Sequence, residues 1–236
     1  MNAPTPAAPA ASVLIVSGLK REAAIMAGPG RLAICGDGPT LRARLAELAD
    51  VRIELVISWG VCGGLDPRLR PGDLILGAEV VSAGGPISTD EAVTSSLAQR
   101  LIDSGARAAV ERVAGVTAAA STARAKAELF QATGAGAVDM ESLTAGRFAL
   151  QRRTPFAILR AVADPADRDL PPLVLNAVHS DGRINAAAVV GELVRSPAQF
   201  PGLLAAARDS WAAFRALGRC RGLLPGLFLG LGSANL

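Results

Sequence analysis

Short apolar runs rich in Val, Ile and Leu recur along the chain, and amphipathic stretches separate them. Runs of this length and composition favour buried β-strands. Strands are predicted at 12–18, 31–35, 53–60, 72–84, 110–121 and 156–164, with a shorter one just before residue 139. The glycine-rich sequence 60–67 is interpreted as the loop that follows the third of them.

The stretches between these runs have the apolar spacing of helices. Helices are predicted at 19–28, 40–50, 90–105 and 123–134, and the segment 186–221 is mostly helical with breaks at Pro197 and Pro201. Thr40 is the expected N-cap of its helix, and Gly134 ends another. Strands that alternate with helices, many of them apolar on both faces, predict an α/β fold. We expect a three-layer αβα sandwich with a central mixed, largely parallel sheet.

The length of 236 residues, half of them hydrophobic, suits a single α/β domain, which we place at 13–221. Residues 1–12 contain Pro and small residues but no Lys or Arg, which predicts a disordered leader rather than a secretory signal. Residues 222–236 stay apolar to the end. Two interpretations of this tail remain open: packing against the domain or a subunit, and contact with a membrane or a lipidic substrate.

Charge and cysteine content exclude several classes of protein. The net charge is +3, without a dense Lys/Arg run or interleaved aromatic residues, so nucleic-acid binding is disfavoured. Three widely spaced cysteines do not form a disulfide framework and favour a reducing, cytoplasmic location. With a single His, the chain offers no metal-ligand cluster, and we expect no metal site.

Charged or glycine-rich sequences follow four of the predicted strands. Ligands of open α/β sheets bind beyond the carboxyl ends of the strands. The four sequences are SGLKRE at 17–22, SWGVCGGL at 58–65, GAVDMES at 136–142 and LRAVADPADRDLPP at 159–172. Their concentration at strand ends predicts one shared site.

These four sequences, in this order, resemble the nucleoside phosphorylase and nucleosidase superfamily. The stretch AVDMES is similar to its Glu-Met-Glu ribose motif, and LRAVAD is similar to the strand that ends in its catalytic Asp. AVDMES beside GVCGGLDPRLRPGD, together with the lipophilic tail, is closest to the hopanoid-associated phosphorylase branch. Proteins of that branch are linked to the removal of adenine from adenosylhopane.

The resemblance implies a role for each acidic residue. Asp164 is expected to donate a proton to the purine. Glu141, with Asp139 beside it, is expected to accept hydrogen bonds from the ribose hydroxyls, and Met140 is expected to form an apolar floor under the sugar. Glu22 stands where nucleosidases place the residue that activates water. Each acid also has a simpler interpretation. Asp164 can pair with Arg160 four residues earlier on the same strand face, Asp139 and Glu141 can favour a helix N-terminus, and Glu22 can be a solvated surface residue.

The loop residues expected to face an anion or the nucleophile are Gly18, Arg21, Gly60, Val61, Cys62 and Gly63. Phosphorylases commonly place an Arg and a Ser around this turn, where this chain has Ser58 and Val61. Ala163 also replaces the Ser that precedes the catalytic Asp in the family. Whether phosphate or water is the nucleophile therefore stays open.

A competing interpretation makes Cys62 the nucleophile of an amidotransferase, because GVCGG fits a Gly-x-Cys-x-Gly elbow. That elbow requires a helix directly after the turn, where the sequence has Pro67 and Pro71, and only His179 is available as base. We therefore predict an enzyme that cleaves a purine N-glycosidic bond, with adenosylhopane as the substrate and a methylthioadenosine/S-adenosylhomocysteine-type nucleosidase as the alternative. The resemblance implies no organic cofactor, and it implies a homo-oligomer.

Overall fold

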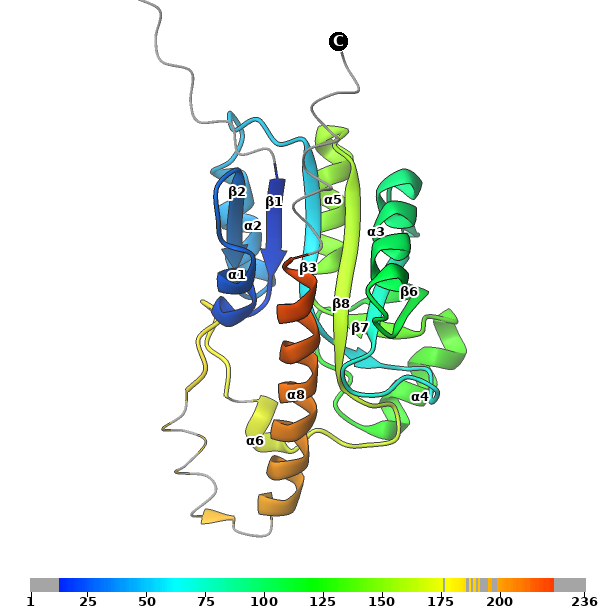
Figure 1. Ribbon diagram of the computed structural model, residues 1–236. Helices are drawn as coiled ribbons and strands as arrows, with labels where there is room; N and C mark the ends of the chain where they lie inside the picture. The colour runs from blue at the N-terminus through cyan, green and yellow to red at the C-terminus, as the bar shows by residue number, and fades with distance from the viewer. Residues whose placement is uncertain are drawn as a thin grey trace, which may run out of the picture.

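The computed structural model describes residues 13–222 except 176, 186, 188, 190, 192–194, 197 and 198. The predicted leader 1–12 and the tail beyond residue 222 lie outside the described residues. Strands and helices alternate as the sequence pattern predicts (Figure 1). The strands are β1 Val13–Ser17, β2 Arg31–Cys35, β3 Leu55–Gly64, β4 Leu74–Val81, β5 Ile87–Ser88, β6 Ala108–Gly115, β7 Ala137–Asp139 and β8 Phe156–Asp164. The helices are α1 Lys20–Met26, α2 Gly38–Ala46, α3 Glu91–Asp103, α4 Ala123–Thr133, α5 Ser142–Arg152, α6 Pro172–Leu175 and α8 Phe200–Cys220.

In the described part of the chain, eight strands form one sheet in the order β2-β1-β3-β7-β6-β4-β5, and β8 pairs with both β3 and β4. Most pairs are parallel, whereas β3–β7, β4–β5 and β4–β8 are antiparallel. Strands β3, β8, β4, β6 and β7 therefore close on themselves into a ring. The prediction of an α/β fold with a mixed, largely parallel sheet is confirmed.

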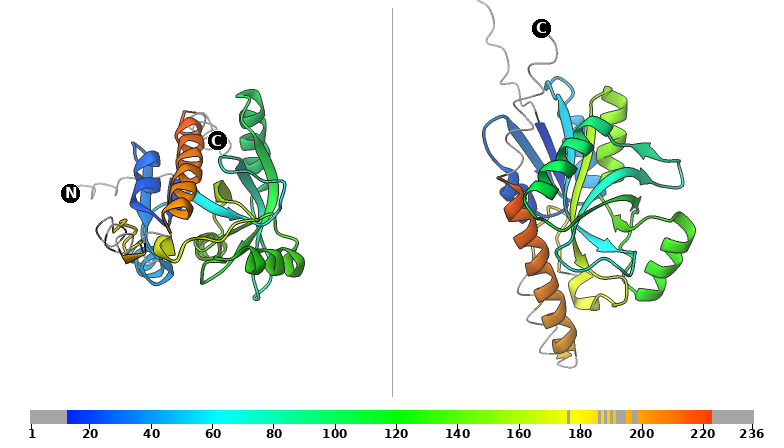
Figure 2. Two further views of the ribbon diagram at one scale, coloured as in Figure 1. Left: turned by 90° about the horizontal axis from the view of Figure 1, so that it is seen from below. Right: turned by 45° about the vertical axis from the view of Figure 1, so that its right-hand side comes forward.

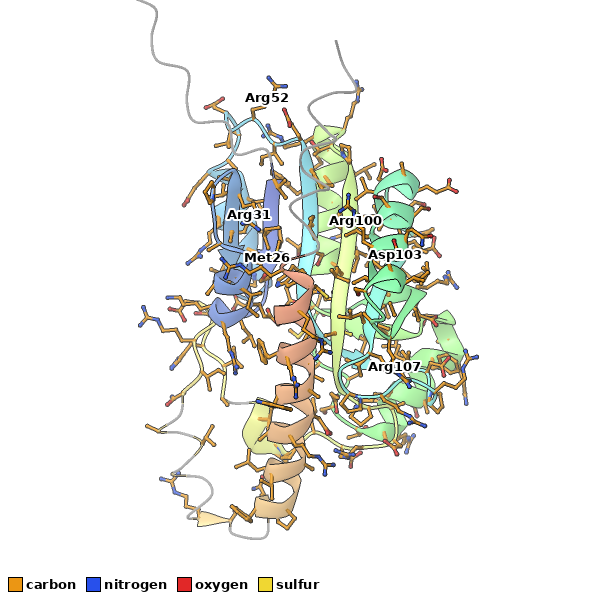
Figure 3. The ribbon with its side chains drawn as sticks, viewed as in Figure 1. Met26, Arg31, Arg52, Arg100, Asp103 and Arg107 are labelled. Carbon is orange, nitrogen blue, oxygen red and sulfur yellow. The ribbon has the colours of Figure 1, made fainter. Side chains whose placement is uncertain are left out.

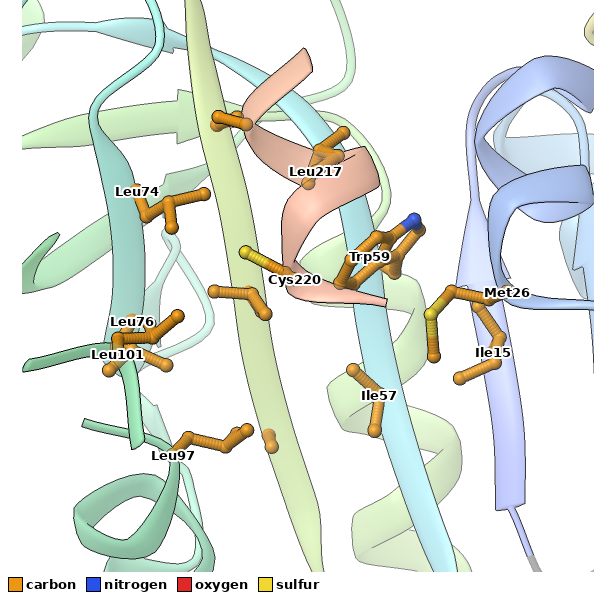
Figure 4. Close-up of a cluster of buried hydrophobic side chains, with 14 of the residues drawn as sticks. Ile15, Met26, Ile57, Trp59, Leu74, Leu76, Leu97, Leu101, Leu217 and Cys220 are labelled. Carbon is orange, nitrogen blue, oxygen red and sulfur yellow. The ribbon is translucent and has the colours of Figure 1, made fainter. Parts of the chain in front are cut away.

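Helices cover both faces of the sheet (Figure 2). Alternate residues of β1 point to opposite faces, so Val13 and Ile15 join one core and Leu14 and Val16 join the other. The first core packs under α1, α3 and α8, and the second under α2 and α5. In Figure 4, Leu217 and Cys220 of α8 lie over the sheet close to Trp59 of β3. Three of the charged residues labelled in Figure 3, Arg52, Asp103 and Arg107, are exposed.

Three predictions of local structure are wrong. The glycine-rich stretch after residue 60 is not a loop, because β3 continues to Gly64 and pairs with β7 and β8 there. The N-cap of α2 is Asp37, whose carboxylate accepts the Thr40 amide at 2.9 Å, rather than Thr40 itself. Pro201 does not break a helix but lies in the first turn of α8, where a missing N–H costs nothing.

None of the helices in the described ranges is both long and apolar enough to cross a bilayer. Helix α8 is the longest of them, and its two halves have different surroundings. Its C-terminal half packs on the sheet, whereas its N-terminal half runs past the strand ends toward α6 (Figure 1). This overhang forms one wall of the candidate site.

Candidate active site

The ends of β1, β3, β7 and β8 meet around one cavity of about 580 Å³. The meeting point is Gly63 of β3, which pairs with Asp164 of β8 on one side and with Val138 of β7 on the other. This register brings the residues after β7 and the end of β8 to opposite sides of the same strand end. Asp139, Met140, Glu141 and Asp164 all line the cavity, as do Arg21, Val61, Cys62 and Gly63. The sequence prediction of one shared site is therefore consistent with the geometry.

The guanidinium of Arg160, which is fully buried on β8, organises one end of the cavity. Its Nε lies 2.7 Å from Oδ2 of Asp139, and its Nη1 lies 3.1 Å from Oε2 of Glu141. Nη2 donates to the Ser58 hydroxyl at 2.6 Å, and Nη1 also donates to the carbonyl of Val61 at 3.3 Å. One buried cation thus holds two carboxylates and the end of β3 together. A buried charge is stable only when it is paired in this way.

Asp139 has protein partners for both carboxylate oxygens. Oδ2 faces Arg160 and accepts a short hydrogen bond from the Ser142 hydroxyl, while Oδ1 accepts the Ser142 amide at 3.1 Å. The hydroxyls of Ser142 and Ser58 lie 2.9 Å apart, and Ser58 is the donor because the single O–H of Ser142 is directed at Asp139. Asp139 therefore orients Arg160 and the start of α5, and its predicted role beside the ribose stays a prediction.

Glu141 differs from Asp139 because its side chain is partly open to the cavity, with 15% of its surface exposed. Burial raises its pKa to about 7, although the positive charge of Arg160 lowers it. Gly18, at the end of β1, permits this placement: a Cβ there would lie 2.6 Å from Oε1 of Glu141. Met140 beside it is 36% exposed and lines the cavity, as expected of an apolar floor.

Glu22 is buried rather than solvated, with 1% of its surface exposed. Its Oε2 accepts the amides of Gly18 and Leu19 at 3.0 and 2.8 Å, and its Oε1 accepts the amide of Val61 at 2.8 Å. Burial raises its pKa, whereas Arg160 and these amides lower it. Gly60 has a φ of +151°, and a Cβ there would lie 2.6 Å from the Glu22 carboxyl. Glu22 therefore fastens β1 to β3 behind the cavity wall, and its predicted role in activating water stays a prediction.

Asp164 does not pair with Arg160, which was the simpler interpretation of their spacing. Its partner is Lys126 of α4, whose Nζ lies 2.8 Å from Oδ2. Burial raises the pKa of Asp164, although the charge and hydrogen bond of Lys126 lower it. The separation from Arg160 has a local cause. The β3–β8 register shifts between Cys62 and Gly63, which leaves Ala163 as an extra residue, and a bulge of this kind turns the following side chain to the other face.

Away from the carboxylates the cavity is apolar. Helix α8 contributes one helical face, and the loops after β6 and β8 complete the wall. Arg21 lies at the rim, with its guanidinium 4.2 Å from the ring centre of Phe214. The apolar lining residues of this part include Val116, Ala119, Ala120, Leu170, Val174, Ala177, Val178, Ile184, Val189, Leu203, Ala206, Ala207, Trp211 and Phe214. Four of the large hydrophobic lining residues, Met140, Val178, Ile184 and Trp211, are also solvent-exposed, so this groove opens to the surface.

The environment of Cys62 argues against a nucleophile elbow. Cys62 lies inside β3 rather than on a turn into a helix. Burial raises the pKa of its thiol, so the reactive thiolate is disfavoured. His179, the required base, is exposed in a turn closed by the Gly182 amide donating to the His179 carbonyl. Within the described residues, no group of three His, Cys, Asp or Glu side chains is placed to hold a metal ion.

Comparison with known families agrees with this geometry. The family model described as phosphorylase superfamily matches residues 4–195. The chain belongs to the phosphorylase superfamily. The prediction of an enzyme of this superfamily is thereby confirmed. A comparison with curated proteins gives no match.

Solved structures of superfamily enzymes have the same fold at low sequence identity. A mutant of the Helicobacter pylori methylthioadenosine/S-adenosylhomocysteine nucleosidase, with 5′-methylthioadenosine in its active site, is 12% identical, with a TM-score of 0.62 over 91% of this chain and 98% of that one. A futalosine hydrolase mutant of the same organism is 12% identical, with a TM-score of 0.60 over 87% and 96%. The Neisseria meningitidis nucleosidase in complex with methylthio-immucillin-A is 18% identical, with a TM-score of 0.59 over 88% and 97%.

Sequence reasoning missed three parts of this superfamily site. The spacing of Arg160 indicates only a pair with Asp164, although a lone cation inside the apolar run FAILRAVAD is itself a sign of buried pairing. Lys126 gave no signal, because a Lys in an amphipathic helix is ordinarily solvated. The apolar wall of α8 was also missed, because only the folded chain brings 200–214 to the strand ends.

Proposed function

We propose that this enzyme cleaves the N-glycosidic bond of an adenosine-type nucleoside. The observation that carries the proposal is that Glu141 and Asp164 line the same cavity from opposite sides of the β3 end, each held by its own cation. A nucleoside placed between them has its ribose toward Glu141 and its base toward Asp164. The two carboxyl groups then act on the two halves of one bond.

The proposed reaction requires one carboxylic acid that is protonated before the bond breaks and one carboxylate that is ionised. When the bond from C1′ to N9 breaks, its electron pair goes to the purine, and a proton from Asp164 to N7 neutralises that charge. The burial that raises the pKa of Asp164 favours the protonated form needed for this step. The sugar becomes cationic, and the ionised form of Glu141, which accepts its hydroxyl groups, stabilises that charge.

The apolar groove supports a substrate with a large apolar 5′ substituent, and we propose adenosylhopane. A nucleoside alone would occupy the charged end of the cavity and leave the wall of Leu203, Ala207 and Trp211 uncovered. Exposed apolar surface that continues a binding cleft is typical of a ligand site. The groove also opens to solvent, which lets a substituent longer than the cavity extend outward.

The charge at the ribose end favours water over phosphate as the nucleophile. Arg160 faces Asp139 and Glu141 and is also close enough to Glu22 for their charges to interact. Its positive charge is therefore balanced within the protein, and a phosphate dianion placed there would meet nearby carboxylates. Arg21, at the rim, is the cation through which phosphate would have to bind instead.

The cytoplasmic location, the homo-oligomer and the contact of the tail with a membrane or lipid are proposed from the resemblance and the sequence alone. The methylthioadenosine/S-adenosylhomocysteine-type activity is the alternative for the same site. It requires only a short or polar 5′ substituent and leaves the groove without a role.

Product analysis tests the function. Purified enzyme is incubated with adenosylhopane, 5′-methylthioadenosine, S-adenosylhomocysteine or adenosine, with and without phosphate, and adenine and the sugar product are identified. We expect adenine release that is fastest with adenosylhopane, a free sugar as product, and a loss of about 10²- to 10⁴-fold in Asp164→Asn. No adenine from any of the substrates would reject the function. Phosphate-dependent release of a sugar phosphate would replace water by phosphate.

A further inference from the structure

Lys126 is a buried cation with no direct part in the proposed bond cleavage. Its side chain has no exposed surface, although it projects from the first turns of α4. An ammonium group has three N–H donors. Nζ donates to the carbonyl oxygens of Pro165 and Arg168 at 2.8 and 2.6 Å, and it lies 2.8 Å from Oδ2 of Asp164. All three donors are thus directed at the segment that begins with the proposed acid.

The position of Lys126 determines which oxygen of Asp164 is available to a ligand. Oδ2 faces the ammonium, and none of the described residues donates a hydrogen bond to Oδ1. A protonated carboxyl has a single O–H. Because Oδ2 already accepts an N–H, the proton of the neutral acid resides on Oδ1. That is the oxygen left to meet a base in the cavity.

The two other hydrogen bonds of Lys126 fasten the backbone behind the acid. The same segment is tied to the start of α4 by two further contacts, from the Ala123 amide to Asp169 and from the Leu170 amide to the Ser121 carbonyl, both at 2.7 Å. Leu170 in turn lines the cavity. Lys126 therefore joins the acid, its supporting segment and the cavity wall into one unit.

Lys126 also acts on the charge of the acid. The groups that face Asp164 are Lys126 from α4, Arg168 from the following segment, Asp209 from α8 and Cys62 from β3. The two cations favour the carboxylate, whereas Asp209 and burial favour the neutral acid, and burial is the largest influence. After the proton leaves Oδ1, the new carboxylate lies against an ammonium that is already in place. Such preorganised charge lowers the cost of proton release.

We propose that Lys126 is the positioning residue of the general acid: it fixes the Asp164 carboxyl with Oδ1 toward the base and sets the pH range in which that oxygen gives up its proton. The catalytic part of this proposal rests on the proposed function. In the step itself, the Oδ1–H bond breaks, an N–H bond forms on the base, and the electron pair of the C1′–N bond stays with the departing base. Lys126 takes no part in making or breaking these bonds.

The test compares Lys126→Met, which removes the charge at similar length, with Lys126→Gln, which keeps amide donors for the backbone carbonyls. Asp169→Ala is the matched control, because it loosens the same segment without facing Asp164. The Asp164 carboxyl is titrated by ¹³C NMR of aspartate-labelled protein, assigned with Asp164→Asn. Rates of adenine release are measured across pH in parallel.

In both Lys126 variants we expect the Asp164 titration and the alkaline limb of the kcat profile to move up by about 1 to 3 pH units. We also expect kcat to fall by about 10- to 100-fold, with KM nearly unchanged, because the acid loses its orientation. Asp169→Ala should keep the wild-type titration. An Asp164 titration that is the same in wild type and Lys126 variants would overturn the proposal. Since the NMR titration needs no turnover, it decides the role of Lys126 even if the wild type releases no adenine.

Discussion

The two ends of the cavity are built on opposite principles. At the charged end, Arg160 and Asp139 are buried and Glu141 is partly buried, and these three charged groups pair with one another. At the α8 end, Trp211 and Ile184 are apolar and more than half exposed. The first end depends on its ion pairs, because a buried charge that loses its partner is costly. The second end keeps apolar surface in contact with water, and covering that surface with a ligand would be favourable.

Because of this difference, substitutions at the two ends should have different effects on folding and activity. Substitutions at the charged end should affect folding and chemistry with every substrate. Substitutions at the apolar end should affect only substrates long enough to reach it.

Replacing Arg160 by Met should lower the free energy of unfolding by about 3–5 kcal/mol, because the buried Asp139 and the partly buried Glu141 lose their cation. Urea denaturation at neutral pH measures this loss. The matched control is Arg52→Met, whose ion pair with Glu54 is at 2.9 Å but whose side chain is 77% exposed, and which should cost at most about 1 kcal/mol. An Arg160 variant as stable as the control would show that the cluster does not depend on its cation.

Replacing Glu141 by Gln should lower kcat/KM by about 10- to 100-fold for every nucleoside tested, because hydrogen bonds to a charged acceptor contribute about 1.5–3 kcal/mol. Steady-state kinetics with adenosine and with adenosylhopane measure the loss. An equal loss for both substrates is the essential result. A loss confined to the lipid substrate would contradict the assignment of Glu141 to the ribose.

The two ends also differ in how far the sequence predicts them. Asp164 and Glu141 lie at or just after the ends of strands that the apolar pattern locates, so the fold predicts that they line the same site. The partners of these acids are not local. Arg160 shares an expected strand face with Asp164 in the sequence, yet the bulge at Ala163 separates them and leaves Arg160 to the acids after β7.

The apolar end depends on contacts that only the folded chain makes. The spacing of apolar residues identifies α8 as a helix. It does not show that the N-terminal half of this helix lies beside the strand ends that form the cavity. The extension of β3 to Gly64 was likewise hidden, because adjacent glycines usually indicate a turn. Here Gly63 fits between β7 and β8, where a Cβ would lie 3.0 Å from Val138.

The pH dependence of activity should reflect the ionisation of Glu141 at the charged end. Burial raises the pKa of Glu141 from its ordinary value near 4.5 to about 7, so the ionised form to which the proposal assigns ribose binding is lost below about pH 7. We expect kcat/KM to fall about tenfold per pH unit on the acid side of that value. Glu141→Gln should abolish this limb, whereas Glu111→Gln should leave it unchanged, because Glu111 also has a raised pKa but does not line the cavity.

The raised pKa of Glu141 also predicts how the stability of the protein changes with pH. Between about pH 4.5 and 7, Glu141 is protonated in the folded protein and ionised in the unfolded chain, so folding takes up a proton. The contribution of Glu141 to stability therefore decreases as the pH rises through that window. Denaturation at pH 5 and pH 8 should show a smaller loss of stability with pH in Glu141→Gln than in wild type. An equal loss in both proteins would contradict the raised pKa.

The apolar end should produce the smallest and most selective effect. Trp211→Ala removes apolar area from the groove, and losing about 50 Å² of contact costs about 1.3 kcal/mol, or roughly tenfold in kcat/KM. That loss should appear with adenosylhopane and be absent with adenosine. Leu204→Ala is the matched control, because Leu204 is 61% exposed on the same helix and does not line the cavity. If both variants act alike, or if Trp211→Ala affects adenosine equally, α8 does not bind the 5′ substituent and the substrate is a smaller nucleoside.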